Sequence, residues 1–444
     1  MVQSAQRPTI FALASASGRA GIAVIRISGP GAMLAIERMT RGAAIPPRTA
    51  TLRILRHPAS SEILDRGLVT WFPGPSSFTG EDVVEISLHG GRAVVASVLS
   101  ALEDLEGYRH AEAGAFTRRA FEAGKFDLAE VEGLADLVAA ETEVQRRQAL
   151  AQAEGLQSRL YEGWRAGLVE AMALVEAGID FSDEADVAVN AFGLARERVV
   201  SIATDMARHL ADGRRGEILR DGFRVVLAGP VNAGKSSLLN ALAERPVAIV
   251  SEEEGTTRDV IEVRLDLDGY PVIVADTAGI RETSSAVERE GILRARHAIE
   301  FADLTLWLVP PDGSDLEVPQ GATVVTIASK ADLGRHGEPF GASVDLAVSA
   351  KSGAGIAELV ALLSRRARAA IDSGAGTPIT SARHRALVTE ARTALETFLA
   401  SDPSDAELRA EDLRIAAAAL GRITGRVDVE DVLDQVFRRF CIGK

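Results

Sequence analysis

The spacing of apolar residues changes along the chain and indicates segments of different secondary structure. Residues 1–118 mix short apolar runs with turns, which is typical of strands joined by tight connections. This first segment therefore has an α+β character. We predict a helix over 92–105, a strand and turn near 10–16, and further strands at 22–27, 68–72 and 83–88.

Residues 119–215 are predicted to be almost wholly helical. Their longest stretch places apolar side chains three or four positions apart, on one face of a helix. We interpret this face as a core-facing stripe and not as a cofactor site. Its members are Leu156, Leu160, Trp164, Leu168, Met172, Val175 and Ile179.

Residues 219–370 alternate strand-like and helical patterns, which is typical of a mostly parallel sheet. Asp268-Gly269 lies between two β-like runs and predicts a hairpin, so the sheet should be mixed. Residues 372–380 are rich in Gly, Ser and Pro and indicate a linker. The helical pattern resumes over 382–440.

These patterns predict an α/β plus all-α protein with four segments. A simple arrangement is one helical domain into which an α/β domain is inserted, and no internal repeat is evident. The predicted segments are an N-terminal α+β domain over 1–118, a helical part over 119–218, the α/β domain over 219–375 and a second helical part over 376–444.

The α/β segment opens with a phosphate-binding loop, Gly229-Pro-Val-Asn-Ala-Gly-Lys-Ser236. It follows the apolar run 223–228 and precedes a helical stretch, which is the context that this motif needs. Lys235 can reach the β- and γ-phosphates and Ser236 can hold Mg²⁺. The alternative is a glycine turn that binds nothing. The predicted nucleotide contacts are Asn232, Ala233, Gly234, Lys235, Ser236 and Ser237.

Three later motifs indicate guanine as the base. The acid of Asp276-Thr-Ala-Gly279 suits Mg²⁺, and its glycine suits the γ-phosphate. Asp332 can accept from the N1–H and the exocyclic amine of guanine, a donor pair that adenine lacks. Four motifs in this order indicate a GTPase. The residues assigned to GTP in the later three are Asp276, Thr277, Ala278, Gly279, Ser329, Lys330, Asp332, Ser349, Ala350 and Lys351.

Composition narrows the class of protein. The chain is 47% hydrophobic and 25% charged, and no apolar run approaches the ~18 residues of a membrane span. A single cysteine excludes an internal disulfide framework and fits a reducing cytoplasm. The net charge of −14 argues against bulk attraction to nucleic acid. Arginine pairs that could contact RNA, or be solvated helix faces, are Arg118-Arg119, Arg146-Arg147, Arg214-Arg215 and Arg438-Arg439.

Lysine is rare in this chain. Only five of the 49 basic residues are lysine, and three of those five lie in the nucleotide motifs. A compact ammonium cannot be replaced by a guanidinium at every kind of site. The other two, Lys125 and Lys444, are therefore candidates for ligand binding, and the alternative is that they are leftover surface lysines.

The ordered motifs resemble those of the translational-factor-like GTPases. Further residues resemble the branch of that superfamily that modifies bacterial tRNA, and they span almost the whole chain. The resemblance implies a Ras-like GTPase domain inserted in a helical domain, with a folate-binding-like domain before them. The residues that carry it are Val24 to Gly29, Phe78 to Asp82, Gly255 to Asp259 and Cys441 to Lys444.

Members of this branch are similar to potassium-activated GTPases, in which K⁺ takes the place of an arginine finger. The resemblance implies K⁺ ligation by Asn232, the backbones of Ser251 and Glu253, and Thr256. Asn232 could instead be a loop-stabilising amide. Thr257 would join Ser236 on Mg²⁺. The GTP contacts implied in this loop are Ser251, Glu252, Glu253, Glu254, Gly255, Thr256 and Thr257.

A hydrolytic water must also be positioned, and no glutamine follows the motif that begins at Asp276. Glu288 matches the acid that this branch uses for the purpose, through a bridging water. The alternative is a solvated helix residue. Ser329 departs from the family pattern, which usually has asparagine there, and its fewer hydrogen-bonding atoms predict weaker nucleotide binding.

The N-terminal segment resembles the folate-binding domains of one-carbon transferases. Arg26, Glu85, Lys125 and Lys444 match the folate positions. Bases suit the carboxylates of the glutamate tail, and an acid suits the pterin. Cys441 is either an inert buried residue or a thiolate that acts on the one-carbon unit.

The resemblance also implies cofactors and partners. The cofactors are GTP, Mg²⁺, K⁺ and 5,10-methylene- or 5-formyltetrahydrofolate. The protein would be a cytoplasmic homodimer that does not associate with a membrane. It would bind a flavoprotein to form a heterotetramer. The pair would place a carboxymethylaminomethyl or aminomethyl group on C5 of the tRNA wobble uridine. Two other functions remain open: a ribosome-assembly GTPase that only binds RNA, and a switch that needs an exchange factor.

Overall fold

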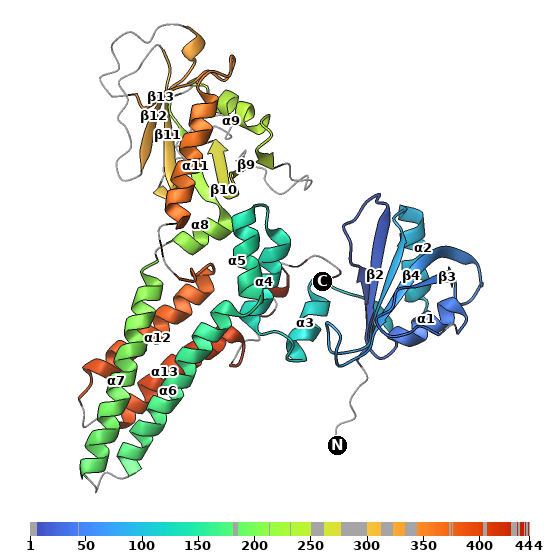
Figure 1. The fold of residues 1–444 in the computed structure, drawn as a ribbon, viewed down its shortest axis with the longest axis horizontal. Coiled ribbons are helices and arrows are strands. Elements are labelled where there is room, and N and C mark those ends of the chain that lie inside the picture. Colours follow the sequence, from blue (N-terminus) through green and yellow to red (C-terminus); the bar gives the residue numbers. More distant parts are fainter. Residues whose placement is uncertain are drawn as a thin grey trace, which may run out of the picture. The chain divides into compact units, whose positions relative to one another are not determined.

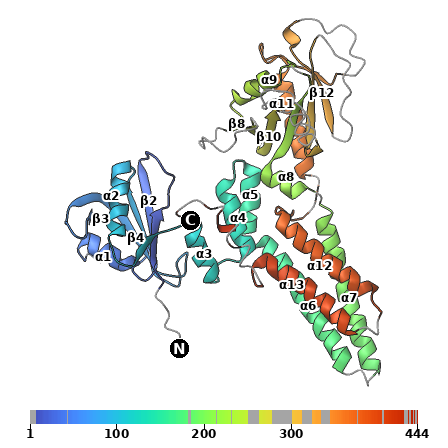
Figure 2. The same ribbon diagram turned by 180° about the vertical axis from the view of Figure 1, so that it is seen from behind.

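The computed structural model divides into two compact units, each described by itself (Figures 1 and 2). Unit 1 contains residues 1–135, 152–162 and 421–444, and unit 2 contains 136–151 and 163–420. The structure describes residues 7–42, 44–180, 185–212, 214–230, 232–249, 262–276, 300–311, 323–333, 344–372, 374, 376–402, 406–427, 433, 436–438, 440 and 443.

Unit 1 is built on a six-stranded sheet with the strand order β3-β4-β5-β2-β1-β6. Neighbouring strands are antiparallel except for the last pair, β1 and β6. Its strands are β1 (Thr9–Leu13), β2 (Ile22–Ser28), β3 (Thr51–Arg56), β4 (Ile63–Phe72), β5 (Val83–His89) and β6 (Tyr108–His110). Because the sheet is open, β3 forms one of its edges.

Two helices cover one face of this sheet, α1 (Ala32–Thr40) and α2 (Arg92–Glu103). Strand alternation explains the choice of face. Ile25 and Ile27 on β2 are fully buried against the helices, whereas Arg26 between them points to the opposite face. The sheet therefore has an apolar, helix-covered face and a second face that carries charged residues.

The rest of unit 1 joins distant parts of the sequence. Helices α3 (Ala115–Glu122) and α4 (Leu128–Ala139) follow the sheet. A small core combines Leu128 and Val131 of α4 with Val436, Phe437 and Phe440 from the C-terminal segment. The last part of the chain thus belongs to the same unit as the first.

Unit 2 contains a seven-stranded sheet with the order β13-β12-β11-β7-β10-β9-β8. The five strands from β13 to β10 are parallel, and β9 and β8 are antiparallel. The strands are β7 (Phe223–Ala228), β8 (Ala248–Ile249), β9 (Glu262–Leu267), β10 (Tyr270–Asp276), β11 (Leu304–Val309), β12 (Val324–Ala328) and β13 (Leu346–Ala347).

Helices α9 (Lys235–Ala243) and α11 (Ile356–Asp372) pack on one face of this sheet, where Val225, Leu239 and Leu359 share a core. Next to the sheet lie α5 (Glu143–Ala153) and α8 (Arg215–Asp221). A bundle of long helices forms the remainder of the unit, and both views show its members side by side. They are α6 (Leu156–Asp180), α7 (Ala185–Leu210), α12 (Ala382–Ala400) and α13 (Ala406–Thr424).

Most predicted elements are confirmed. The strands predicted at 22–27 and 83–88 are β2 and β5, and the hairpin at Asp268-Gly269 joins β9 to β10. The predicted linker lies between α11 and α12. None of the described helices combines the length and apolar character that a membrane crossing needs.

Three elements were not predicted, namely α1, β3 and β6. β3 alternates exposed and half-buried residues at the sheet edge, and β6 has only 3 residues, so neither has a strong apolar signal. The stripe on α6 also needs one correction. Leu156 is 41% exposed, whereas Tyr161, Trp164, Leu168 and Val175 form the buried face.

Candidate functional site

The nucleotide motifs lie at one edge of the seven-stranded sheet. The phosphate loop directly follows β7, Asp276 is the last residue of β10, and Ser329 directly follows β12. These strands are parallel, so their carboxyl ends meet at the same edge, where α/β sheets bind ligands. The topology therefore collects motifs that lie more than a hundred residues apart.

The lysine of the phosphate loop is partly buried and bonded to the loop itself. Gly229 has φ 137°, and a Cβ added there would lie 2.5 Å from the carbonyl oxygen of Leu308, so only glycine fits. Nζ of Lys235 donates to the carbonyl oxygens of Gly229 at 3.0 Å and Pro230 at 2.9 Å. Burial lowers the pKa of Lys235, and the nearby Asp276 carboxylate opposes that shift.

Two oxygen ligands meet beside that lysine. The Ser236 hydroxyl at the start of α9 donates to Oδ2 of Asp276 at 2.6 Å. Asp276 is only 2% exposed, because β10 is flanked by β7 and β9. Hydroxyl and carboxylate oxygens are the ligands that Mg²⁺ prefers. The two side chains fit a magnesium site completed by phosphate oxygens and water.

The base-reading motifs are also brought together. The Ser349 hydroxyl donates to Oδ1 of Asp332 at 2.7 Å, and this hydrogen bond lowers the pKa of the carboxyl. The backbone N–H of Ala331 donates to the carbonyl of Val348 at 3.0 Å. Asp332 is thus held ionised, as an acceptor of guanine's two donors requires.

Ser329 replaces the usual asparagine without extending toward a base. Its side chain is 3% exposed, and its hydroxyl donates to the carbonyl of Val309 at 3.2 Å. That hydrogen bond links the carboxyl ends of the neighbouring strands β11 and β12. The hydroxyl is therefore engaged locally, in line with the prediction that it does less for the nucleotide.

A second group of predicted residues lies on the charged face of the sheet in unit 1. Arg26 on β2 and Glu85 on β5 are directly opposite in the strand register. Nε and Nη2 of Arg26 donate to Oε1 of Glu85 at 3.0 Å and 2.8 Å. The guanidinium also lies 5.4 Å from the ring centre of Phe78 and 5.7 Å from that of Phe116. Such a pair, between aromatic rings, can bind a flat polar ligand.

The loop between β4 and β5 connects this pair with Lys125. Nζ of Lys125 donates to the carbonyl of Pro75 at 2.5 Å, and Phe78 of the same loop contacts Arg26. At the other side, Nη1 of Arg26 donates to the carbonyl of Gly443 at 3.5 Å. Arg26 and Lys125 thus contact one loop, Glu85 is bonded to Arg26, and Gly443 contacts the same guanidinium.

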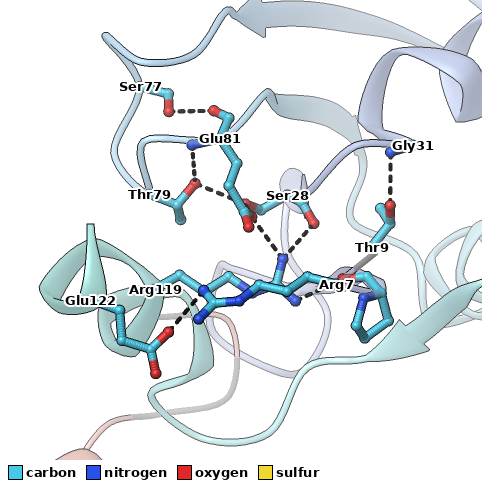
Figure 3. A network of polar contacts seen from close by, with 10 residues as sticks. Arg7, Thr9, Ser28, Gly31, Ser77, Thr79, Glu81, Arg119 and Glu122 are labelled. Atoms are coloured by element: carbon cyan, nitrogen blue, oxygen red, sulfur yellow. Dashed lines mark hydrogen bonds and ion pairs between the residues drawn. The ribbon is translucent and has the colours of Figure 1, made fainter. Parts of the chain in front are cut away.

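A buried polar network fixes that loop (Figure 3). Nη1 of Arg119 donates to Oε2 of Glu81 at 2.7 Å and to the carbonyl of Ser28 at 3.2 Å. Its Nη2 donates to the carbonyl of Pro8 at 2.7 Å. The Ser28 hydroxyl bonds both Thr79, at 2.8 Å, and Glu81, at 2.9 Å. One guanidinium therefore ties α3 to β1, β2 and the loop.

Comparison with known proteins covers nearly the whole chain. A family model described as the MnmE helical domain matches residues 128–441, and one described as the GTP-binding protein TrmE N-terminus matches 9–125. The tRNA modification GTPase MnmE of Parvibaculum lavamentivorans is 53% identical, over 98% of this chain and 100% of that protein. A mitochondrial 5-taurinomethyluridine-[tRNA] synthase subunit of Danio rerio is 47% identical, over 98% and 93%.

The chain belongs to the MnmE family of tRNA modification GTPases. The enzyme class is therefore GTP hydrolase, and the predicted fold class is confirmed: an MnmE N-terminal domain, a helical domain and a Ras-like GTPase domain with a mixed sheet. Among solved structures, Aquifex aeolicus Era is 22% identical over 38% of this chain and 66% of that chain, with a TM-score of 0.26.

Several residues expected from the MnmE resemblance lie outside the described ranges. For these the assignment stays a prediction. Asn232 is described and adopts a left-handed backbone with φ 62°. The residues outside are Ser251, Glu252, Glu253, Glu254, Gly255, Thr256, Thr257, Thr277, Ala278, Gly279, Glu288, Cys441 and Lys444.

Sequence reasoning missed two residues in the surroundings of the Arg26 and Glu85 pair. Phe116 stacks on Arg26, although no pattern distinguishes it from an ordinary core phenylalanine. Arg119 was considered a possible RNA contact, but it is only 9% exposed and engaged by Glu81, so that interpretation is wrong. The run from Phe78 to Asp82, which carries part of the family resemblance, could have pointed to this region, since Phe78, Thr79 and Glu81 belong to it.

Proposed function

We propose that this protein is a potassium-activated GTPase that acts with the flavoprotein MnmG on C5 of the tRNA wobble uridine. Its tRNA substrate is suggested by the names of its relatives. The main support for GTP and Mg²⁺ binding is the 2.6 Å hydrogen bond between Ser236 and Asp276, which brings the phosphate loop and the second motif together. GTP hydrolysis would drive a conformational change and take no part in the modification itself.

In this proposal, Lys235 moves from the loop carbonyls to the β- and γ-phosphates. Its donors are already directed into the loop, at Gly229 and Pro230, so a phosphate oxygen could replace either carbonyl. Ser236 and Thr257 hold Mg²⁺. Asp332 reads guanine, and Ala350 contributes a backbone contact.

Potassium would be held by Asn232, the backbones of Ser251 and Glu253, and Thr256. The support is the family pattern, together with the left-handed turn of Asn232 within the loop. The cation offsets charge on the transferring phosphate where other GTPases use an arginine. Glu288 positions the water.

A tetrahydrofolate would bind on the charged face of the N-terminal sheet, where it would supply the one-carbon unit. Arg26 and Glu85 offer a base and an acid between Phe78 and Phe116. Lys125 donates to the carbonyl of Pro75, in the loop that also carries Phe78. Lys444 directly follows Gly443 in the sequence, and the contact of the Gly443 carbonyl with Arg26 supports its proposed role.

Cys441 is proposed to act on the one-carbon unit as a thiolate. The support is again Gly443, two positions further along the chain, which lies against β1: a Cβ added to it would lie 2.1 Å from the Leu13 carbonyl. Gly443 therefore lies close to the proposed folate face. A thiolate is a better nucleophile at neutral pH than a hydroxyl of similar size.

The proposed assembly is a cytoplasmic homodimer that joins MnmG in a heterotetramer. The N-terminal sheet offers surface for a second copy, because its face opposite α1 and α2 carries exposed apolar side chains. The most exposed of these are Ile22 and Leu52, each 66% exposed, and Leu68, 44% exposed.

The test is a reconstituted reaction with MnmG, tRNA, methylenetetrahydrofolate and GTP, run in matched KCl and NaCl. We expect GTP turnover and nucleoside modification only with K⁺, and Asn232→Ala should remove the difference between the salts. Equal GTP turnover in both salts would disprove the potassium role.

Cys441→Ser should keep K⁺-stimulated GTP turnover and lose modification in the same assay. Full modification by that variant would make Cys441 an inert buried residue. Loss of both activities calls for Cys441→Ala, whose circular dichroism and GTP turnover separate misfolding from chemistry.

A further inference from the structure

One stretch of the N-terminal domain is basic within an otherwise acidic protein. Residues 38–61 contain five arginines and no Asp or Glu, whereas the whole chain has a net charge of −14. They form the end of α1, the following loop, edge strand β3 and the turn after it. With one arginine of β4 they make up the arginine edge, defined as Arg38, Arg41, Arg48, Arg53, Arg56 and Arg66.

The arginine edge differs in its partners from the other arginine clusters considered above. Several arginines elsewhere are paired with carboxylates: Arg119 with Glu81, Arg220 with Asp136, and both Arg146 and Arg147 with Glu143. Within the part of the chain that the structure describes, no carboxylate forms an ion pair with any member of the arginine edge. Its positive charge is thus not neutralised locally.

The members that make contacts donate to backbone carbonyls. Nη2 of Arg53 bonds Ala44 at 2.5 Å, and Nη1 of Arg56 bonds Ser61 at 3.1 Å. Arg48 bonds the Ser76 carbonyl and lies over the Phe72 ring. Such contacts hold a guanidinium in place and leave its charge intact, so these side chains are oriented but still attract anions.

Backbone geometry adds an independent observation. Arg41 and Arg48 both adopt left-handed conformations, with φ of 58° and 56°. Glycine or asparagine is the usual residue there, because a longer side chain is strained. A basic residue at the end of α1 would be favourable for the helix dipole, but Arg48 lies in a loop and has no such reason.

We propose that the arginine edge binds the phosphate backbone of the tRNA substrate. The proposal rests on the proposed function, which makes tRNA the substrate. Phosphates supply most of the affinity of proteins for nucleic acids, and guanidinium groups are their preferred ligands. It also explains how a protein of net charge −14 can bind a polyanion, because the arginine pairs on α5 and α8 are already matched by acids.

The competing explanation is protection of a sheet edge. Charged residues on an edge strand prevent pairing with another chain, and β3 is such a strand. That explanation concerns the charges on β3 itself, and it predicts no change in RNA binding when arginines beside β3 are replaced. The two explanations therefore differ in the RNA affinity that they predict for such a variant.

The experiment measures tRNA binding to the full chain by fluorescence anisotropy, from about 50 to 200 mM KCl. The edge variant is Arg41→Gln with Arg66→Gln, since both side chains are exposed and neither makes a contact that folding needs. The control is Arg146→Gln with Arg147→Gln on α5, which removes the same charge. Circular dichroism of each variant reports on folding.

We expect the edge variant to bind tRNA roughly tenfold more weakly at 0.1 M salt, with a salt dependence reduced by about one to two ions. The control should match the wild-type protein. Arg41→Lys with Arg66→Lys keeps the charge and should retain most of the affinity, which keeps the test valid if the glutamine variant is unstable.

Unchanged binding by the edge variant overturns the proposal. Equal loss of tRNA affinity in the edge variant and the control overturns the proposal as well, because the loss would then follow from the change in net charge and not from this surface. A wild-type protein without measurable tRNA affinity would contradict the proposed substrate and this surface together.

Discussion

The two sheets of this protein carry their candidate sites in different ways. In unit 2 the parallel strands place the described motif residues at one edge, each at or just after the end of a strand. In unit 1 the strands are mostly antiparallel, and the site lies on a face, with Arg26 and Glu85 in the middle of β2 and β5. The residues of a site at strand ends are contiguous in the sequence and form recognisable motifs. The residues of a site on a sheet face are alternate residues of several strands and form no such motif.

The comparison predicts that the two sites can be disabled one at a time. The largest effect is expected for Lys235→Ala, which should reduce GTP turnover by about a thousandfold because its ammonium has no substitute near the phosphates. Affinity for 5-formyltetrahydrofolate, measured by titration calorimetry, should not change. Loss of folate binding in this variant would show that the two units are coupled through the nucleotide site.

Asp332→Asn should lower the preference for GTP over XTP by about a hundredfold, because an amide accepts from one group and donates to the other. Competition binding of the two nucleotides measures the ratio. Ser349→Ala offers a milder control, since it keeps the carboxylate and removes only the Ser349 hydroxyl, which donates to Asp332 and accepts from the backbone N–H of Ser352. An unchanged preference would mean that this motif does not read the base.

Arg26→Gln should weaken 5-formyltetrahydrofolate binding by roughly tenfold or more, the usual cost of losing one charged hydrogen bond, about 1.5–3 kcal/mol. GTP turnover should stay normal. Arg109→Gln is the matched control, because Arg109 is exposed on β6 in the same unit. Equal folate affinity in both variants would move the ligand away from the Arg26 and Glu85 pair.

The smallest effect concerns pH and should be confined to unit 2. Burial against the helical bundle lowers the pKa of His209 to about 4, and its ring lies 5.4 Å from that of Trp164. The unfolded chain, with a histidine pKa near ~6.5, then binds more protons at acid pH, so stability falls as pH drops. Between pH 7 and 5.5 we expect a loss of about 1 kcal/mol.

Urea unfolding followed by tryptophan fluorescence measures this loss. His209→Gln should flatten the pH dependence of the midpoint. His110→Gln, exposed in unit 1, should leave it as in the wild-type protein. A slope that survives in His209→Gln would assign the acid sensitivity to another group.

The same contrast explains what the sequence could predict. The phosphate loop needs Gly229, and the strand before it is a plain apolar run, so motif and element were both readable. Arg26 and Glu85 were placed only by resemblance, because their pairing depends on strand register, which is set by contacts 59 residues apart in sequence. Phe116 could not be found at all, since stacking on Arg26 leaves no trace in local pattern.

Some misses have a local cause. β3 carries arginines where an interior strand would have apolar residues, so its pattern is weak, and α1 has only 9 residues. Leu156 was assigned to the buried stripe of α6 by spacing alone. It lies at the first turn of the helix, where the face that packs is decided by neighbouring segments.

The contact between Arg26 and the Gly443 carbonyl has a consequence for how the protein is made. The two residues are 417 positions apart, and translation proceeds at about 5–20 residues per second, so they are synthesised roughly 20–80 s apart. The sheet of unit 1 can fold long before its last neighbour leaves the ribosome. On this schedule the N-terminal sheet would fold first, whereas the site on its charged face would be completed last.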